Sequence, residues 1–290
     1  MSDQVFLIDK QEARRAFEKS ASQYDEAAVL QREIGDRMLE RLDYINHQPA
    51  SILDVGAGTG YCSQHLAERY AKADIYALDF AVNMLRQARS SAGWWQRFRK
   101  RFTFIAGDAE QLPLADGSID MLISSLAIQW CNDLDRVFAE FRRVLAPGGM
   151  LMFTTFGPDT LKELRSSWAA VDGVSHVNQF FDMHDIGDAL IRHGFAEPVM
   201  DTEYITMTYR DAMGLMKELK QIGAHNVTAG RRRQLTTRAQ LKQMLAAYEQ
   251  FRMDGLLPAS YEVIYGHAWA PAQQRVSIPV SQAFGQPLNN

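Results

Sequence analysis

The sequence predicts an α/β fold built on a mostly parallel β-sheet. Between residues 51 and 155, short runs rich in aliphatic and β-branched residues alternate with amphipathic stretches, the pattern of strands joined by crossover helices. The strand runs are almost continuously apolar, as expected where helices cover both faces of a sheet. With 290 residues, 47% of them hydrophobic and 23% charged, the chain can form one large domain and is too apolar to be disordered.

The elements are expected in the following order. Residues 10–46 are expected to be helical, in two helices, because Leu30, Ile34, Met38, Leu42 and Ile45 recur at helical spacing. The strands of the first half are expected at 51–55, 74–79, 102–107, 119–125 and 149–155, with helices from about residues 61, 81 and 134. In the second half, helices are expected at 159–171, 183–193, 211–222 and 237–252, and strands at 198–209 and 261–270. Residues 271–290 have little periodicity and are expected to be a loosely held tail.

Charge and composition exclude several classes of protein. A net charge of −4 leaves no overall positive field of the kind that nucleic-acid binders have. Cys62 and Cys131 are too few for a disulfide framework and lack the spacing of a metal site, so reduced thiols and no metal are expected. No signal peptide is visible, and the apolar runs fall far short of the ~20 residues that span a bilayer. We therefore expect a cytoplasmic protein with no membrane or nucleic-acid partner.

A glycine-rich loop follows the first predicted strand. The segment ILDVGAGTG (52–60) places Gly56, Gly58 and Gly60 where a strand ends and a helix begins, so backbone N–H groups can approach a ligand. Nicotinamide and flavin enzymes share such loops, so the glycines alone are a weak signal. Asp54, two residues before Gly56, would repel a pyrophosphate. A cationic ligand such as S-adenosylmethionine, with its sulfonium and ammonium groups, fits this carboxylate better.

Two further carboxylates follow the next strands of the sheet. Asp79 ends the second strand, 21 residues after Gly58, where a carboxylate commonly accepts hydrogen bonds from ribose hydroxyls. Asp108 follows the third strand and can accept from the exocyclic amine of adenine. Taken singly, Asp79 could cap the next helix and Asp108 could cap a turn. Together with the glycine loop, at the edge where α/β sheets bind ligands, they favour a nucleoside site.

These motifs resemble those of the class I S-adenosylmethionine-dependent methyltransferases. ILDVGAGTG is similar to their first motif, ALDF to the acidic second, GDAEQLPL to the third, IDMLISSLAIQW to the fourth strand and RRVLAPGGML to the turn before the fifth. The resemblance implies a Rossmann-like, seven-stranded sheet whose last strand is antiparallel beside the fifth. It also implies a cofactor site made by Asp54, Gly56, Gly58, Gly60, Asp79, Phe80, Met84, Asp108, Ala109, Glu110 and Ser125.

Segments outside the cofactor half indicate the methyl acceptor. Residues 14–32, 125–134, 155–165, 219–241 and 257–269 resemble the malonyl-[acyl-carrier protein] O-methyltransferases of biotin synthesis. That family implies methyl transfer to the free carboxylate of a malonyl thioester. We expect one domain over 1–270, with an N-terminal helical lid (10–46), a cofactor half (50–155) and an acceptor half (156–270). The chain is expected to be a monomer or a weak dimer. Helical insertions are then expected after the fifth and sixth strands.

The acceptor chemistry needs no general base, because a malonyl carboxylate is already a nucleophile. Alignment in a water-poor pocket is then the main contribution to catalysis. Gln129 and Trp130 follow the fourth strand and are expected to face the methyl group, with Tyr24 in the lid and Arg165 binding the carboxylate. The alternatives are a core aromatic for Trp130, a helix-packing residue for Tyr24 and a surface amide for Gln129. His184 fits the start of a helix better than the role of a base.

An acidic carrier protein would need a locally basic surface. Arg231, Arg232 and Arg233 are expected to contact it, whereas residues 97–101 of the second basic cluster (94–101) are expected to be a solvated face. Two other functions stay open. Residues 155–165 and 211–270 also resemble the methyltransferase-like assembly factors of respiratory complex I, which modify an arginine, and the quinone-pathway methyltransferases share the cofactor half.

Overall fold

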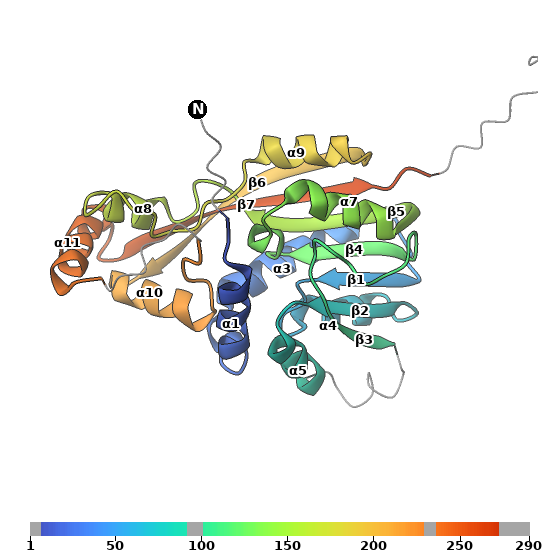
Figure 1. Cartoon of the computed structure of the whole chain (residues 1–290), viewed down its shortest axis with the longest axis horizontal. Helices are drawn as coiled ribbons and strands as arrows, with labels where there is room; N and C mark the ends of the chain where they lie inside the picture. Colours follow the sequence, from blue (N-terminus) through green and yellow to red (C-terminus); the bar gives the residue numbers. More distant parts are fainter. Residues whose placement is uncertain (1–6, 92–100, 229–235, 273–290) are drawn as a thin grey trace, which may run out of the picture.

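A computed structural model describes residues 7–91, 101–228 and 236–272 (Figure 1). A seven-stranded sheet with the order β3-β2-β1-β4-β5-β7-β6 forms its centre. The strands pair in parallel from β3 to β5, and β7 is antiparallel to both β5 and β6. The strands are β1 (Ser51–Val55), β2 (Asp74–Asp79), β3 (Phe102–Ala106), β4 (Ile119–Ser125), β5 (Leu145–Phe156), β6 (Ala196–Tyr209) and β7 (Leu257–Trp269). The expected α/β fold, with its antiparallel last strand beside the fifth, is confirmed.

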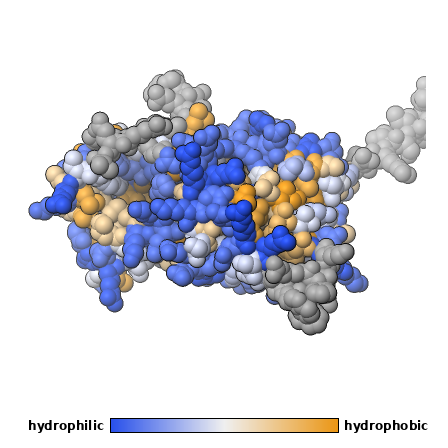
Figure 2. All heavy atoms as spheres, turned by 60° about the horizontal axis from the view of Figure 1, so that its bottom comes forward, coloured by the Kyte–Doolittle hydropathy of each residue, from blue (hydrophilic) through white to orange (hydrophobic). Residues whose placement is uncertain are grey.

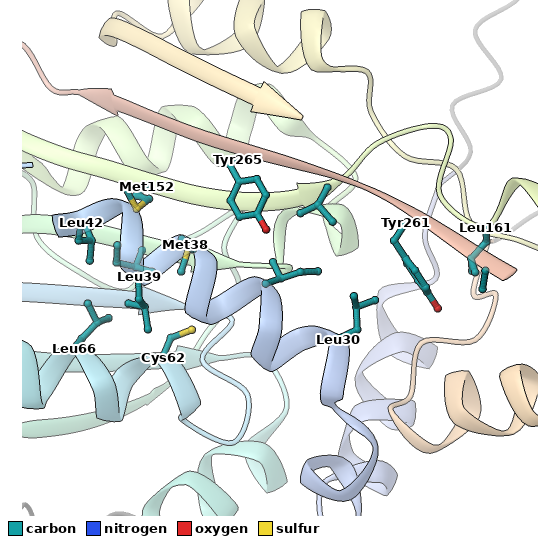
Figure 3. Close-up of a cluster of buried hydrophobic side chains, with 14 of the residues drawn as sticks. Leu30, Met38, Leu39, Leu42, Cys62, Leu66, Met152, Leu161, Tyr261 and Tyr265 are labelled. Carbon is teal, nitrogen blue, oxygen red and sulfur yellow. The ribbon is translucent and has the colours of Figure 1, made fainter. Parts of the chain in front are cut away.

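Alternating side chains along each strand give the sheet its two buried faces. Ile52, Met150 and Met152 point to one face, and Leu53 and Leu151 point to the other. The first face packs against α3 (Val29–Arg41) and α4 (Tyr61–Arg69), as Figure 3 shows for the side chains of α3 beside those of α4, β5 and β7. The second face packs against α7 (Leu134–Val144) and α9 (Met183–Arg192). Helices on both faces explain why the strand runs are so apolar.

The N-terminal region has more breaks than the sequence indicated. In place of two helices, residues 10–44 form α1 (Lys10–Ser20), α2 (Tyr24–Ala27), α3 and the short 3₁₀ turn η1 (Leu42–Tyr44). The Asp9 side chain caps α1 by accepting from the Glu12 N–H at 3.1 Å. The break at residues 21–23 gives α1 a direction different from that of α3. In Figure 1, α1 stands beside the sheet while α3 lies against it.

The remaining helices of the described residues lie in the segments that connect one strand to the next. They are α5 (Val82–Ser91), η2 (Ile128–Trp130), α8 (Lys162–Ala169), α10 (Ala212–Gln221), α11 (Arg238–Tyr248) and η3 (Glu249–Phe251). As expected, helices are inserted after β5 (α8 and α9) and after β6 (α10 and α11). The far ends of β6 and β7 extend beyond the other strands and carry α8, α10 and α11, on the left of Figure 1.

Three strands begin earlier than the sequence indicated, and β6 starts at residue 196 and not 198. β7 starts at residue 257 and not 261, because residues 257–262 pair with β6 alone and β5 reaches only as far as Val263. Pro258 therefore lies where one side of the strand has no partner, and its missing N–H breaks no ladder. β5 starts at residue 145 and not 149, because Leu145 pairs with Ile119 before a shift in register.

Parts of several expected features lie outside the described residues. Arg231, Arg232 and Arg233, most of the 94–101 cluster and most of the 271–290 tail are among them. Within the described ranges, no helix has the length and apolar character to cross a membrane. Much of the face shown in Figure 2 is hydrophilic, with hydrophobic residues gathered toward its two sides.

Candidate active site

The glycine loop follows β1 at the carboxyl edge of the sheet. Gly56 has a φ of +76°, and a Cβ atom there would lie 2.2 Å from the Cβ atom of Ala127. Only glycine fits a backbone this close to the segment after β4. At Gly58, φ is +56° and no heavy atom lies within 4 Å of an added Cβ, so the loop leaves open space on that side.

Asp79 is buried at the end of β2, with 5% of its surface exposed. Its Oδ2 accepts from the Gly58 N–H at 2.9 Å, and its Oδ1 accepts from the Ala81 N–H at 2.7 Å. Burial raises the pKa of Asp79 to about 6, although the backbone hydrogen bonds oppose that change. The bond to Ala81 matches the helix-cap alternative, since α5 begins at Val82. It leaves the remaining lone pairs of the carboxylate for a ligand.

Asp54 is the second buried carboxylate of the site, with 1% of its surface exposed. It accepts from the Ser63 hydroxyl of α4, and burial together with the charge of Asp79 raises the pKa of Asp54 to about 6. Two carboxylates in one poorly solvated place destabilise each other when both are ionised. A ligand with positive charge would relieve that repulsion, which is the electrostatic preference that the sequence indicated.

A cavity of about 80 Å³ lies between the strand ends and the N-terminal helices. It collects most of the predicted cofactor and acceptor residues: Tyr24, Gly56, Gly58, Asp79, Phe80, Met84, Asp108, Ala109, Ser125 and Trp130. A neighbouring cavity of about 60 Å³ adds Asp54 and shares Tyr24, Gly56, Gly58 and Ser125 with the first. The two form one elongated site, which we call the cofactor cleft, and Tyr24 lies at their junction.

Four predicted site residues lie outside the lining of the cofactor cleft. Gly60 is the residue before α4, and Glu110 accepts from the Asn132 and Asp133 N–H groups at 2.6 and 3.2 Å. The Gln129 side chain donates to the Leu126 carbonyl at 2.8 Å and accepts from the Thr155 hydroxyl at 3.3 Å. Gln129 is thus neither a surface amide nor aimed into the cleft; it links the ends of β4 and β5.

Arg165 also points away from the cofactor cleft. Its guanidinium donates to the Pro158 carbonyl at 2.7 Å and to the Thr160 carbonyl at 2.9 Å, which fixes the turn before α8. Burial lowers the pKa of Arg165 from its ordinary value. Its predicted role as the cation for the malonyl carboxylate gains no support from this arrangement.

The N-terminal helix α1 closes one side of the cleft. Lys10 Nζ lies 2.8 Å from a carboxylate oxygen of Asp108 and 2.8 Å from one of Glu110, and Lys10 lines the cleft. The Glu18 carboxylate accepts from the Val82 N–H at 2.7 Å and caps the start of α5. Phe17 packs edge-on to the Trp130 ring, with ring centroids 5.1 Å apart. Sequence reasoning missed Lys10 and Phe17, because nothing local to residues 10–17 marks them as facing a site after β4.

Gln31 and Arg32 were also missed, and they line the Asp54 end of the cleft. Gln31 Oε1 is buried and has no hydrogen-bond partner among the described residues. An unsatisfied buried oxygen is costly and suits a ligand that brings a donor. The residues at this end therefore fit the amino-acid part of S-adenosylmethionine: Gln31 Oε1 and Asp54 for the ammonium and Arg32 for the carboxylate. Within the described residues, no group of three or more His, Cys, Asp or Glu could hold a metal ion.

The strand order, the antiparallel β7 and the acidic cleft beside a glycine loop define the class I methyltransferase fold. A family model described as "Methyltransferase domain" matches residues 53–153. Among solved structures, the YcgJ protein of Bacillus subtilis is similar with a TM-score of 0.57 at 17% identity, over 81% of this chain and 98% of that one. The [4+2]-cyclase SpnF is similar with a TM-score of 0.53 at 19% identity, over 83% and 82%. The second name shows that the fold alone does not define the reaction.

Sequence comparison defines the family. A malonyl-[acyl-carrier protein] O-methyltransferase of Gallionella capsiferriformans is 54% identical over 92% of this chain and 93% of the relative. A relative of the same name from Laribacter hongkongensis is 54% identical over 93% of this chain and 92% of its own length. The chain belongs to the malonyl-[acyl-carrier protein] O-methyltransferase family.

Proposed function

We propose that the chain transfers a methyl group from S-adenosylmethionine to the free carboxylate of malonyl-[acyl-carrier protein], as an early step of biotin synthesis. The observation that carries this proposal is the name shared by relatives that are 54% identical over more than nine-tenths of the chain. The cofactor cleft supports it independently, since its buried carboxylates favour a cationic ligand. The relatives reported above carry neither the complex I nor the quinone-pathway name.

The residues of the cleft then have distinct tasks. Bound S-adenosylmethionine supplies an electrophilic methyl group on a sulfonium. Asp79 binds the ribose hydroxyls, and Asp54, Gln31 and Arg32 bind the amino-acid end. Phe17 and Trp130 form an apolar wall that keeps water from the reacting atoms. Excluding water favours the reaction, because a carboxylate and a sulfonium cancel each other's charge as the ester forms.

Tyr24 is suited to hold the acceptor in this cleft. It lies at the junction of the two cavities, and burial together with the charges of Asp79 and Asp25 raises the pKa of Tyr24 well above its ordinary value. Its hydroxyl therefore stays protonated at neutral pH, so Tyr24 can donate a hydrogen bond to the malonyl carboxylate and cannot act as a base.

The test is direct. The purified chain, incubated with S-adenosylmethionine and malonyl-carrier, should produce the monomethyl ester of the malonyl group and S-adenosylhomocysteine in equal amounts, measured by mass spectrometry. Acetyl-carrier, which lacks the free carboxylate, is the control and should not react. Growth of a biotin auxotroph lacking this methylation step should be restored by the chain. Methylation of a protein arginine with no ester formed would contradict the proposal and favour the assembly-factor alternative.

A further inference from the structure

A second and larger cavity lies on the other side of α1 from the cofactor cleft. Its volume is about 620 Å³, in the range of pockets that hold a whole small-molecule ligand. Its walls come from α1, α8, residues 176–180, and α10 with the turn that follows. We call it the acceptor-side cavity. None of the cofactor residues predicted from the sequence line it.

The helix α1 and the turn after it separate the two sites. Ala16 and Gln23 line the acceptor-side cavity, whereas their chain neighbours Phe17 and Tyr24 line the cofactor cleft. Figure 1 shows α1 between α10 on one side and the strands β1 and β2 on the other. A group bound in the larger cavity is therefore only one helix away from Tyr24, and the turn at residues 21–23, which follows the end of α1 at Ser20, joins the linings of the two cavities.

The buried residues that line the acceptor-side cavity are apolar except for Ser20 and Asn178. Leu161, Leu164, Trp168 and Val177 are buried residues of its lining. Asn178 is buried among them, and its Oδ1 accepts from the Val227 N–H at 3.1 Å. No hydrogen bond of the Asn178 Nδ2 group to any described residue is found, which leaves this donor for an occupant. The interior thus suits a narrow chain of methylene and amide groups.

Lysines occupy the rim of the same cavity. Lys19 of α1 and Lys217 and Lys220 of α10 line the cavity and are exposed. None of the three forms an ion pair within the part of the chain that the structure describes. Neighbouring lysines without counter-charges repel each other, and an anion at the rim would relieve that repulsion.

We propose that the acceptor-side cavity receives the phosphopantetheine arm of the carrier protein, with the arm's phosphate and the acidic surface of the carrier at Lys19, Lys217 and Lys220. This inference rests on the proposed function, because it takes the carrier as the substrate. The arm combines methylene and amide groups with a phosphate at its protein end, so it matches an apolar, amide-bearing interior behind a basic rim. The thioester end then lies against the α1 wall, from which the malonyl group reaches Tyr24 past residues 21–23.

The test compares carrier with and without the arm, by fluorescence anisotropy of labelled carrier. We expect the chain to bind arm-bearing carrier at least about 10-fold more tightly than carrier without the arm. Met216→Trp, which fills the cavity from α10, should reduce this preference to about 2-fold or less. The matched control is Met213→Trp on the same helix, because Met213 is 48% exposed and lies outside the lining. Ala16→Leu fills the cavity from α1 and serves as a second variant should Met216→Trp fail to fold.

The rim is tested by reversing charge. Lys217→Glu with Lys220→Glu should weaken binding of both carrier forms about 10-fold at low salt, and added salt should remove most of the difference. Lys72→Glu with Lys242→Glu is the matched control, since both lysines are exposed, lie outside the cavity lining and give the same change in net charge. Unchanged affinity for S-adenosylhomocysteine in every variant would show that the cofactor cleft is intact.

The outcomes separate this inference from the proposed function. The titration involves no methyl transfer, so a chain that prefers arm-bearing carrier yet forms no methyl ester would contradict the proposed function alone. A chain that forms the ester but binds both carriers equally would overturn the cavity assignment, as would equal effects of Met216→Trp and Met213→Trp. A loss of binding in the rim variant that its control reproduces would overturn the role of the lysines.

Discussion

Asp54 and Asp79 are buried carboxyl groups whose ionisation is linked to stability. The pKa of each rises to about 6, mainly because burial removes water from the charged form. In the unfolded chain, the pKa of an aspartate is about 4. Between about pH 4 and pH 6, the folded chain therefore binds more protons at these two groups than the unfolded chain does. Their contribution to the free energy of unfolding is therefore greatest below pH 4 and decreases as the pH rises to about 6, above which it is constant.

The first prediction follows from the charge of the ligand. Binding of S-adenosylmethionine should weaken as the pH falls from 7 to 5, because protonation of Asp54 and Asp79 removes the charges that its cations meet. S-adenosylhomocysteine lacks the sulfonium, so its affinity should depend less steeply on pH. Calorimetry of both ligands at several pH values measures the difference. Equal pH dependence for the two ligands would show that the carboxylates do not sense the sulfonium.

The second prediction concerns Asp79 alone. Asp79→Ala removes the charged acceptor predicted for the ribose hydroxyls, and hydrogen bonds to charged groups contribute ~1.5–3 kcal/mol, so S-adenosylhomocysteine should bind roughly 10–100-fold more weakly. Calorimetry measures the affinity, and circular dichroism checks the fold. Asp201→Ala is a control, because Asp201 lies on β6 outside the cleft lining. Normal affinity in a folded Asp79→Ala variant would leave Asp79 as the cap of α5 only.

The sequence could predict some residues of the cleft and not others, for a physical reason. Asp54, Gly56 and Asp79 stand at strand ends, and strand ends of a parallel sheet meet at one edge whatever the helices do. Lys10 and Gln31 reach the same cleft from helices whose placement depends on tertiary packing. Their local pattern is that of any amphipathic helix, so only the structure brings them to the site.

At the scale of elements, α1 is held over the cleft by contacts at both of its ends. Lys10 pairs with Asp108 and Glu110 near the start, and Glu18 accepts from the Val82 and Asn83 N–H groups near the end. Each contact joins α1 to a loop or helix of the cofactor half. The helix therefore serves as a cover whose attachment uses Asp108, which is also the predicted acceptor for the adenine amine.

The third prediction tests this attachment. Lys10→Met keeps the aliphatic stem but removes the charge, and a partly exposed ion pair contributes on the order of 1 kcal/mol. We expect hydrogen exchange to become faster in residues 10–20 and S-adenosylhomocysteine to dissociate several-fold faster. Arg15→Met on the same helix is the control, since Arg15 is exposed and lines neither cavity. A cover held mainly by Phe17 and Glu18 would instead leave exchange and dissociation unchanged in Lys10→Met.

The sequence predicted elements well where a single periodicity governs them. The strands at 51–55, 74–79 and 119–125 have the predicted bounds, because turns or helix starts with clear residue signals limit each of them. The start of β7 was missed, because Pro258 is typical of a turn and its acceptance in a strand depends on where β5 ends. Two helices were expected over 10–46, but the break at residues 21–23 was not located, because the helical spacing from Leu30 to Ile45 lies entirely after it.

At the scale of the whole molecule, different parts of the sheet carry the two halves of the predicted reaction, and α1 lies between them. The carboxyl ends of β1, β2 and β4 present the cofactor cleft, and the long β6–β7 pair carries α8 and α10 out to form the acceptor-side cavity. Sequence motifs locate the cofactor cleft, because the motif residues that line it lie at the ends of strands. The second is assembled from segments more than 150 residues apart, such as Lys19 and Lys220, and no local pattern indicates it.

The fourth prediction concerns the pH dependence of the complete reaction. With both substrates saturating, the rate should be constant from about pH 6.5 to 8.5. The malonyl carboxylate loses its proton below this range, and the Tyr24 hydroxyl loses its proton only above it, so neither group changes charge within the range. The measurement is the rate of S-adenosylhomocysteine formation at each pH. A rise with an apparent pKa near 7 would indicate a histidine base. His225→Gln would then be the first variant to test, because His225 lines the acceptor-side cavity. His184→Gln is the control, because the His184 side chain is 86% exposed and contacts Asp182 outside both cavities. A constant rate in the wild-type chain and in both variants is the result expected for a reaction that needs alignment and charge neutralisation but no proton transfer.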